Sequence, residues 1–194
     1  MQFSFRQRLW VLAAPLCMSL ATPSMAADAM PRVAMDTSMG RIVLELNPQR
    51  APKTVDNFLQ YVRDGHYDGT IFHRVIQGFM IQGGGFTPDL REKQTRAPIP
   101  LEARGGLPNL RYTIAMARTS DPNSATSQFF INVNNNDFLN ANQAQDGYGY
   151  TVFGKVIEGF NVVEQIAATK TGSRGWMGDV PTRPIIIQKV SVLR

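Results

Sequence analysis

The chain has 194 residues, 43% of them hydrophobic, and its 20 Lys and Arg outnumber its 15 Asp and Glu, for a formal net charge of +5. This length suits one domain with a sizeable core, and this composition argues against disordered and fibrous proteins. The basic residues are scattered, without runs or interleaved aromatic residues, so nucleic acid is not an expected partner.

The first 26 residues have the pattern of a secretory signal peptide. Arg6 and Arg8 precede the apolar stretch of residues 9–21, and small residues then lead to a possible cleavage site after Ala26. The apolar stretch is shorter than the roughly 20 residues of a membrane span. We therefore expect export and no stable membrane association after cleavage, with a retained anchor as the alternative.

The remaining segment, residues 27–194, is expected to form a single domain. The only cysteine, Cys17, lies in the signal peptide, so this segment can form no disulfide and carries no thiol nucleophile or thiolate metal ligand. Loss of Arg6 and Arg8 lowers the basic count from 20 to 18 against 15 acids, for a net charge of +3.

Residues 32–46 predict a β-hairpin, because two alternating runs flank the turn at Ser38, Met39 and Gly40. A helix should follow, since the sequence then changes period. Its apolar stripe has i, i+3, i+4 and i+7 spacing, Pro52 can occupy its first turn, and Gly65 can end it. The stripe consists of Val55, Phe58, Leu59 and Val62.

The rest of the chain predicts short strands and a second helix around residues 161–168, which would bury Val163, Ile166 and Ala167. The strands are expected at residues 70–76, 79–83, 111–117, 128–133, 151–157 and 185–193. Many short strands with only two helices favour a closed barrel or a sandwich over a parallel α/β sheet. The long Pro- and Gly-rich passage of residues 84–110 suggests a functional surface loop, with an interdomain linker as the alternative.

Motifs for common hydrolytic chemistry are missing. The two histidines, His66 and His73, have no zinc-protease spacing, and Ser127 lies outside a nucleophile elbow. Glycines 83–85 lack the Lys-Ser or Lys-Thr of a phosphate-binding loop, so a bulge or a tight strand exit is favoured.

Arg74 is the residue that needs an explanation, because it lies inside an apolar hairpin. Strict alternation would place it on one face with Phe72 and Ile76. Such an arginine can simply pack its stem on a barrel and extend its head into water. Nearby Met80 and Gln82 favour a binding groove instead, because they add apolar surface and an amide.

The segment YDGTIFHRVIQGFMIQGG, residues 67–84, resembles the signature of cyclophilin-type peptidyl-prolyl isomerases. The later segments MAR (116–118), SQFFI (127–131) and FGKV (153–156) agree with that family in the same order. The resemblance covers nearly all of the segment after the signal peptide. It implies a mainly β fold, a closed eight-stranded antiparallel β-barrel capped by two α-helices, with the active site in a groove on the outer surface.

The resemblance also implies residue roles, with Arg74 as the catalytic residue and the others binding substrate. Those others are Phe79, Met80, Phe130 and Leu139 in the proline pocket, Gln82 and the backbone near Ala117 and Arg118 along the peptide, and His73, Gln128, Phe138 and Tyr150 at the rim. Phe138 and Tyr150 stand where many eukaryotic members have tryptophan and histidine. Weak binding of the macrocycle cyclosporin is therefore expected.

These features predict an exported prolyl isomerase that assists folding in the periplasm. It would act on proline-containing, unfolded or partly folded polypeptides and would need no cofactor and no metal. A non-catalytic chaperone that uses the same groove is the alternative, although holding a chain would not need the charge of Arg74. A secreted hydrolase or lectin-like barrel fits less well.

Overall fold

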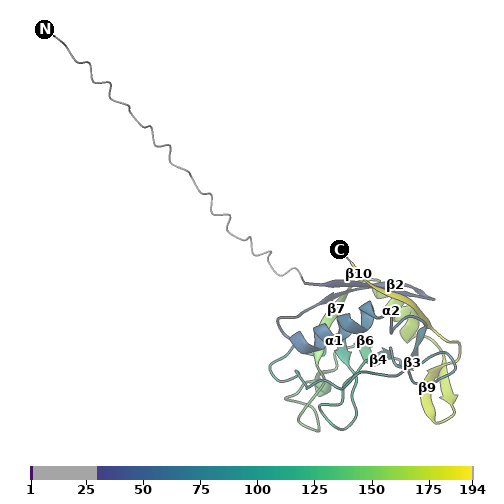
Figure 1. Cartoon of the computed structure of the whole chain (residues 1–194). Helices are drawn as coiled ribbons and strands as arrows, with labels where there is room; N and C mark the ends of the chain where they lie inside the picture. Colours follow the sequence, from purple (N-terminus) through teal and green to yellow (C-terminus); the bar gives the residue numbers. More distant parts are fainter. Residues whose placement is uncertain (2–29, 194) are drawn as a thin grey trace.

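The computed structural model describes Met1 and residues 30–193, so the predicted signal peptide, except for Met1, lies outside the described residues. The strands of the described part are β1 (Arg32–Thr37), β2 (Gly40–Leu46), β3 (Thr70–Ile76), β4 (Met80–Gly83), β5 (Thr113–Met116), β6 (Phe129–Asn132), β7 (Val152–Glu158), β8 (Thr171–Arg174), β9 (Met177–Pro181) and β10 (Ile186–Leu193). The helices described are α1 (Pro52–Arg63), the 3₁₀-helix η1 (Asp137–Leu139) and α2 (Phe160–Ala167) (Figure 1).

Eight strands close into an antiparallel barrel in the order β1-β10-β3-β4-β6-β5-β7-β2, and β2 pairs back to β1. The closed barrel is therefore confirmed, and the sandwich is not formed. The expected strands and both expected α-helices occur, with ends that lie no more than two residues from the predicted ends. Closure removes exposed sheet edges from the barrel, since each strand has a neighbour on both sides.

Aromatic side chains fill the barrel interior and join it to α1. Phe58 of α1 lies 5.1 Å, between ring centroids, from both Tyr67 and Phe153, and 5.9 Å from Phe129. The predicted stripe of α1 is buried, because these residues face the barrel. Val163 and Ile166 of α2 belong to the same core.

The N-terminus of α1 is capped by a residue from the long loop. Ala51 provides no side-chain cap, but the Lys53 and Thr54 N–H groups donate to the Glu102 carboxylate at 3.1 and 2.9 Å. A carboxylate there satisfies free backbone donors and complements the helix dipole. The loop of residues 84–110 is thus tied to α1.

A β-bulge in β3 overturns the alternation expected around Arg74. Phe72 pairs with Gly83, and Arg74 pairs with Gln82. Between these two pairs β3 is longer than β4 by one residue. His73 is the extra residue. Phe72 therefore belongs to the barrel core while Arg74 is exposed, and the prediction that they share a face is wrong.

Hairpin β8–β9 was not predicted. All residues of β8 are exposed, and the TGSR sequence has no apolar alternation that would indicate a strand. The hairpin lies beside β3, outside the barrel (Figure 1). Over the part of the chain that the structure describes, no helix has the length and apolar character needed to cross a membrane.

Candidate active site

Strand register aligns the candidate residues across the outer face of the barrel. Arg74 of β3 pairs with Gln82 of β4, Gln82 pairs with Phe130 of β6, and Phe130 pairs with Ala115 of β5. Directly opposed residues in antiparallel strands have Cβ atoms about 4.5–5.5 Å apart. The guanidinium, the amide and the aromatic ring therefore lie in one row, although they come from distant parts of the sequence.

An apolar pocket adjoins this row, with a volume of about 200 Å³. We call it the Arg74 pocket; it is lined by Arg74, Phe79, Met80, Gln82, Ala117, Arg118, Phe130, Leu139 and Tyr150. Drug-sized ligands usually occupy pockets of roughly 300 Å³ or more, so this one suits a single compact apolar group. Met80 and Phe130 are buried at its base and form a cluster separate from the barrel core.

Arg74 extends beside this pocket with 44% of its side chain exposed. Its Nε atom lies 3.7 Å from Oδ2 of Asp179 in β9, which is itself half exposed. Asp179 has a positive φ of 58°, which is uncommon for a residue other than glycine. A half-exposed pair at this distance leaves the guanidinium free to donate to another acceptor.

A chain of amides continues from Gln82. Gln82 Nε2 donates to Gln128 Oε1 at 3.1 Å, and Gln128 Nε2 donates to Glu92 Oε1 at 3.5 Å. Any side chain at Gly85 would collide with Gln128, so this glycine makes room for it. Gln128 thus lies outside the Arg74 pocket but holds Gln82 at its edge.

His73 is buried instead of lying on an open rim. It is 3% exposed, its ring centroid lies 4.7 Å from that of Phe86, and its Nδ1 has no partner among the described residues. Burial, with a smaller contribution from the charge of Arg74, lowers the pKa of His73 to about 4. The imidazole is therefore neutral at pH 7.

Arg118 supports the pocket through a buried side chain. This side chain is 2% exposed, forms an ion pair with Asp146 and donates from Nε to the Gly149 carbonyl at 3.0 Å. Its guanidinium carbon lies 4.5 Å from the Tyr150 ring centroid. Arg118 therefore fixes the loop that carries Tyr150. The Ala117 N–H donates to the Gln128 carbonyl at 2.9 Å, so this backbone donor is already used.

Buried asparagines position the segment that carries Phe138 and Leu139. Asn136 Nδ2 donates to Asn132 Oδ1 at 2.7 Å and to the Phe79 carbonyl at 2.9 Å. Leu139 lines the Arg74 pocket, whereas Phe138 is 57% exposed and lies 5.6 Å from the Phe79 ring. Phe138 thus extends the apolar surface beyond the pocket.

Two wider cavities flank the Arg74 pocket. One, of about 520 Å³, shares Arg74 and Gln82 with it and is bounded on its other side by Trp176, Met177 and Asp179; we call it the hairpin pocket. His73, Phe86, Glu92, Gln128 and Gly178 complete its lining.

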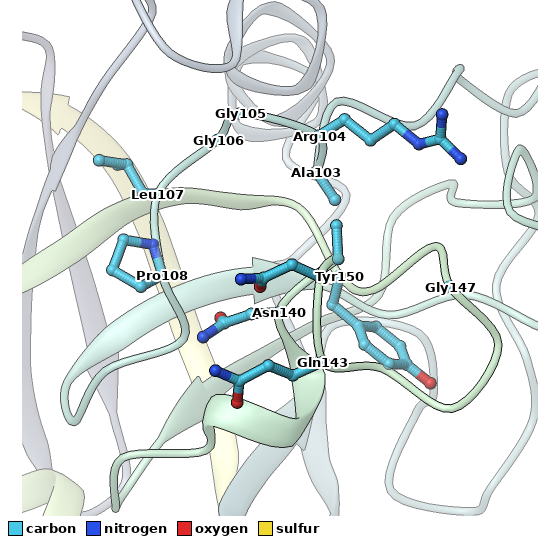
Figure 2. A pocket seen from close by; sticks show the side chains of 12 residues that line it. Ala103, Arg104, Gly105, Gly106, Leu107, Pro108, Asn140, Gln143, Gly147 and Tyr150 are labelled. Carbon is cyan, nitrogen blue, oxygen red and sulfur yellow. The ribbon is translucent and has the colours of Figure 1, made fainter.

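The other cavity, of about 610 Å³, shares Tyr150 with the Arg74 pocket and lies between residues 103–108 and 140–147. In Figure 2 the amides of Asn140 and Gln143 point to the side of Pro108, the Tyr150 ring points the opposite way, and Arg104 extends away from all three. Arg104 is the one charged residue in its lining, and no cross-strand row like that of Arg74, Gln82 and Phe130 runs beside it.

Sequence reasoning missed the residues contributed by the hairpin, and it missed Asp146 in the loop after η1. An exposed tryptophan within the polar, Gly-rich segment of residues 171–179 was the available signal for Trp176. Nothing in the local sequence links Asp146 to Arg118, because 28 positions separate them. Within the described residues, no three or more His, Cys, Asp or Glu side chains gather as a metal site would require.

Comparison with known proteins agrees with this geometry. Residues 32–192 match the model of the family described as cyclophilin type peptidyl-prolyl cis-trans isomerase. The chain is 61% identical to a peptidyl-prolyl cis-trans isomerase of Streptomyces antibioticus, covering 84% of this chain and 99% of that protein. It is 52% identical to peptidyl-prolyl cis-trans isomerase B of Escherichia coli K12, covering 82% of this chain and 98% of that one.

A solved structure shares the fold. It is a cyclophilin-type isomerase of Cryptosporidium parvum determined in the presence of the dipeptide Ala-Pro, with a TM-score of 0.72 and 30% identity, covering 84% of this chain and 99% of that one.

Proposed function

The chain belongs to the cyclophilin-type peptidyl-prolyl cis-trans isomerases, and from this premise we propose that Arg74 is its catalytic residue and that its substrates are exported, unfolded or partly folded proteins. The observation that supports the role of Arg74 most directly is its position in the cross-strand row. There a permanently charged donor lies beside a compact apolar pocket.

Prolyl isomerisation needs no more than one hydrogen-bond donor beside one apolar pocket, for a physical reason. Rotation about an Xaa-Pro bond breaks no covalent bond, but it crosses a barrier of roughly 18–20 kcal/mol set by amide resonance. As the bond twists, the proline nitrogen leaves conjugation and regains a lone pair. A guanidinium aimed at that nitrogen binds the twisted state more strongly than the planar one, and this difference lowers the barrier.

The apolar pocket contributes by holding the proline ring. Met80 and Phe130 form its buried base, and Phe79, Leu139 and Tyr150 line its partly exposed margin. With the ring held, the rest of the peptide rotates, and Gln82 can bind the peptide backbone beside Arg74. Arginine suits the role because its charge is permanent and its donors form a planar fork.

The proposed location is the periplasm of a Gram-negative type of cell. The basic residues, apolar stretch and small residues within 1–26 support it, since they match a cleavable signal peptide. Fractionation with intact-mass analysis tests this. A mature protein beginning near Ala27 in the periplasmic fraction is expected, whereas a membrane-bound protein that retains residues 1–26 would contradict it.

Refolding kinetics test the proposed substrates. The refolding of an unfolded protein limited by a trans-to-cis proline step takes tens of seconds or more. Substoichiometric amounts of this enzyme should accelerate that slow phase in proportion to enzyme concentration. If a short Xaa-Pro peptide is isomerised but the slow phase is unaffected, the isomerase assignment stands and the folding role fails.

A further inference from the structure

The hairpin pocket is continuous with the Arg74 pocket. Arg74 and Gln82 line both cavities, and Asp179 of the hairpin lies 3.7 Å from Arg74. An extended peptide advances about 3.3 Å per residue. A polypeptide with its proline ring in the Arg74 pocket must therefore bring residues within a few positions of that proline to the edge of the hairpin pocket.

The hairpin is firmly packed against the barrel. Met177 and Val180 are buried in a cluster with Ile71 of β3 and Phe86, and Arg174 Nη1 donates to the Pro88 carbonyl at 3.1 Å. The residues on both sides of the hairpin tip are thus anchored. A surface fixed in this way can bind a peptide without a large cost for ordering itself.

Trp176 lies at the tip of this anchored hairpin and lines the cavity with 83% of its surface exposed. A single exposed apolar residue is ordinary on protein surfaces. Trp176 differs from such isolated residues because it lies on the anchored hairpin and lines a cavity that is continuous with the Arg74 pocket. Tryptophan is also enriched among the residues that contribute most to binding.

Both acidic groups of the cavity already have partners. Asp179 faces Arg74, and Glu92 accepts from Gln128 at 3.5 Å. The apolar surface that the cavity offers to a ligand is therefore mainly the exposed ring of Trp176, because Met177 and Phe86 beside it are buried. The exposed indole offers a face on which an aromatic or aliphatic side chain can pack.

We propose, on the basis of the function proposed above, that the hairpin pocket is a second substrate subsite and that Trp176 determines its specificity. Its occupant is an aromatic or large aliphatic side chain of the substrate, within a few residues of the proline. Such side chains are exposed in unfolded chains and buried in native ones. The subsite would therefore favour unfolded polypeptides over folded proteins with an exposed proline.

Peptide isomerisation measured by NMR exchange tests this subsite. The peptides have one proline in an alanine background, with Phe placed in turn at each of the two positions before and the two positions after the proline. The readout is the ratio of kcat/KM for each Phe peptide to that for the all-Ala peptide. This ratio does not depend on the active fraction of a variant. At one position at least, we expect a ratio of about three to ten, as an aromatic contact would produce.

Trp176→Ala should lower that ratio toward one. Phe160→Ala is the matched control, since Phe160 is an exposed aromatic residue that lines none of the three cavities, and it should keep the ratio. Ratios near one at all four positions in the unchanged protein, or a ratio that persists in Trp176→Ala, would overturn the subsite. If the all-Ala peptide is not isomerised, the proposed catalytic function fails instead.

Discussion

At the scale of single residues, the guanidinium of Arg74 is the group on which the proposed turnover depends. Removing one preorganised donor to a transition state typically costs about 2.7–4 kcal/mol, on the order of a hundred- to thousandfold in rate. We expect a loss approaching that size in Arg74→Ala. Arg74→Lys should also be poor, because an ammonium group lacks the planar fork. Isomerisation rates on a short Xaa-Pro peptide measure both effects.

Melting curves of the same variants separate catalysis from stability. The Arg74 side chain is 44% exposed and its ion pair with Asp179 is half exposed, so neither supports much of the core. Melting temperatures should therefore change little. A near-normal rate in Arg74→Ala would favour a groove that only holds its ligand, and a large loss of stability would assign Arg74 a structural role.

Phe138 allows a test of the rim by cyclosporin. Its ring is 57% exposed and lies 5.6 Å from the Phe79 ring, so it extends the pocket surface but offers no N–H donor. A missing hydrogen bond costs roughly 0.5–1.5 kcal/mol. Weak inhibition should therefore become several-fold stronger in Phe138→Trp. Phe160→Trp, which adds an indole at a position that lines none of the three cavities, should leave inhibition unchanged. Equal inhibition of both variants would refute the assignment of the rim.

At the scale of elements, the loop after η1 is held by Asp146. This carboxylate pairs with the buried Arg118 side chain and accepts from the Tyr148 and Gly149 N–H groups at 2.9 and 3.2 Å. Hydrogen bonds to charged groups contribute about 1.5–3 kcal/mol, and partial exposure reduces this. Asp146→Ala should therefore cost about 1–2 kcal/mol of unfolding free energy.

The same change should also raise KM more than it lowers kcat, because Tyr150 loses the support of Arg118 while Arg74 is untouched. Denaturant melts and steady-state kinetics on one peptide measure the two effects. Asp121→Ala, at an exposed turn before Asn123, is the control and should leave KM unchanged. An unaltered KM in a destabilised Asp146→Ala would show that Tyr150 does not depend on this loop contact.

At the scale of the whole molecule, buried histidine makes stability depend on pH. The folded pKa of His73, about 4, lies below the ordinary value of 6.5, and burial lowers the pKa of His66 as well. Between these values the unfolded chain binds more protons. The free energy of unfolding should therefore be highest above pH 6.5 and should fall as pH is lowered toward 4, by roughly 3 kcal/mol for His73.

Melting curves from pH 7.5 to 2 in the unchanged protein and in His73→Gln measure this contribution above pH 4. The substitution removes the titrating group, so the fall with decreasing pH should become shallower. Below pH 4 a second loss should follow in both proteins, because the pKa of Asp146 is held at about 2 by its hydrogen bond with Arg118. An identical pH profile for the two proteins above pH 4 would show that His73 is not the group responsible.

Local patterns in the sequence determined most of the elements of this fold. The stripe of α1 and the alternating strands follow from burial of one face of a helix or strand, and this is a property of neighbouring residues. The residues of the candidate groove were found by resemblance. All eight residues that line the Arg74 pocket besides Arg74 come from three segments, residues 79–82, 117–130 and 138–150. Alternation alone could not choose between a barrel and a sandwich.

Only the tertiary structure decided which of these side chains meet and which face the core. The bulge at His73 depends on the register of β3 against β4, and it turns Phe72 inward and Arg74 outward. Arg118 pairs with Asp146, and Arg74 lies beside Asp179. The two members of each pair are too far apart in sequence for a local pattern to predict the contact. Hairpin β8–β9 is held in place because Met177 and Val180 pack on Ile71. Its strands do not alternate between apolar and polar residues, so the sequence pattern alone does not predict them. Strand pairing and docking depend on contacts distant in sequence, whose partners are selected only when the chain closes on itself.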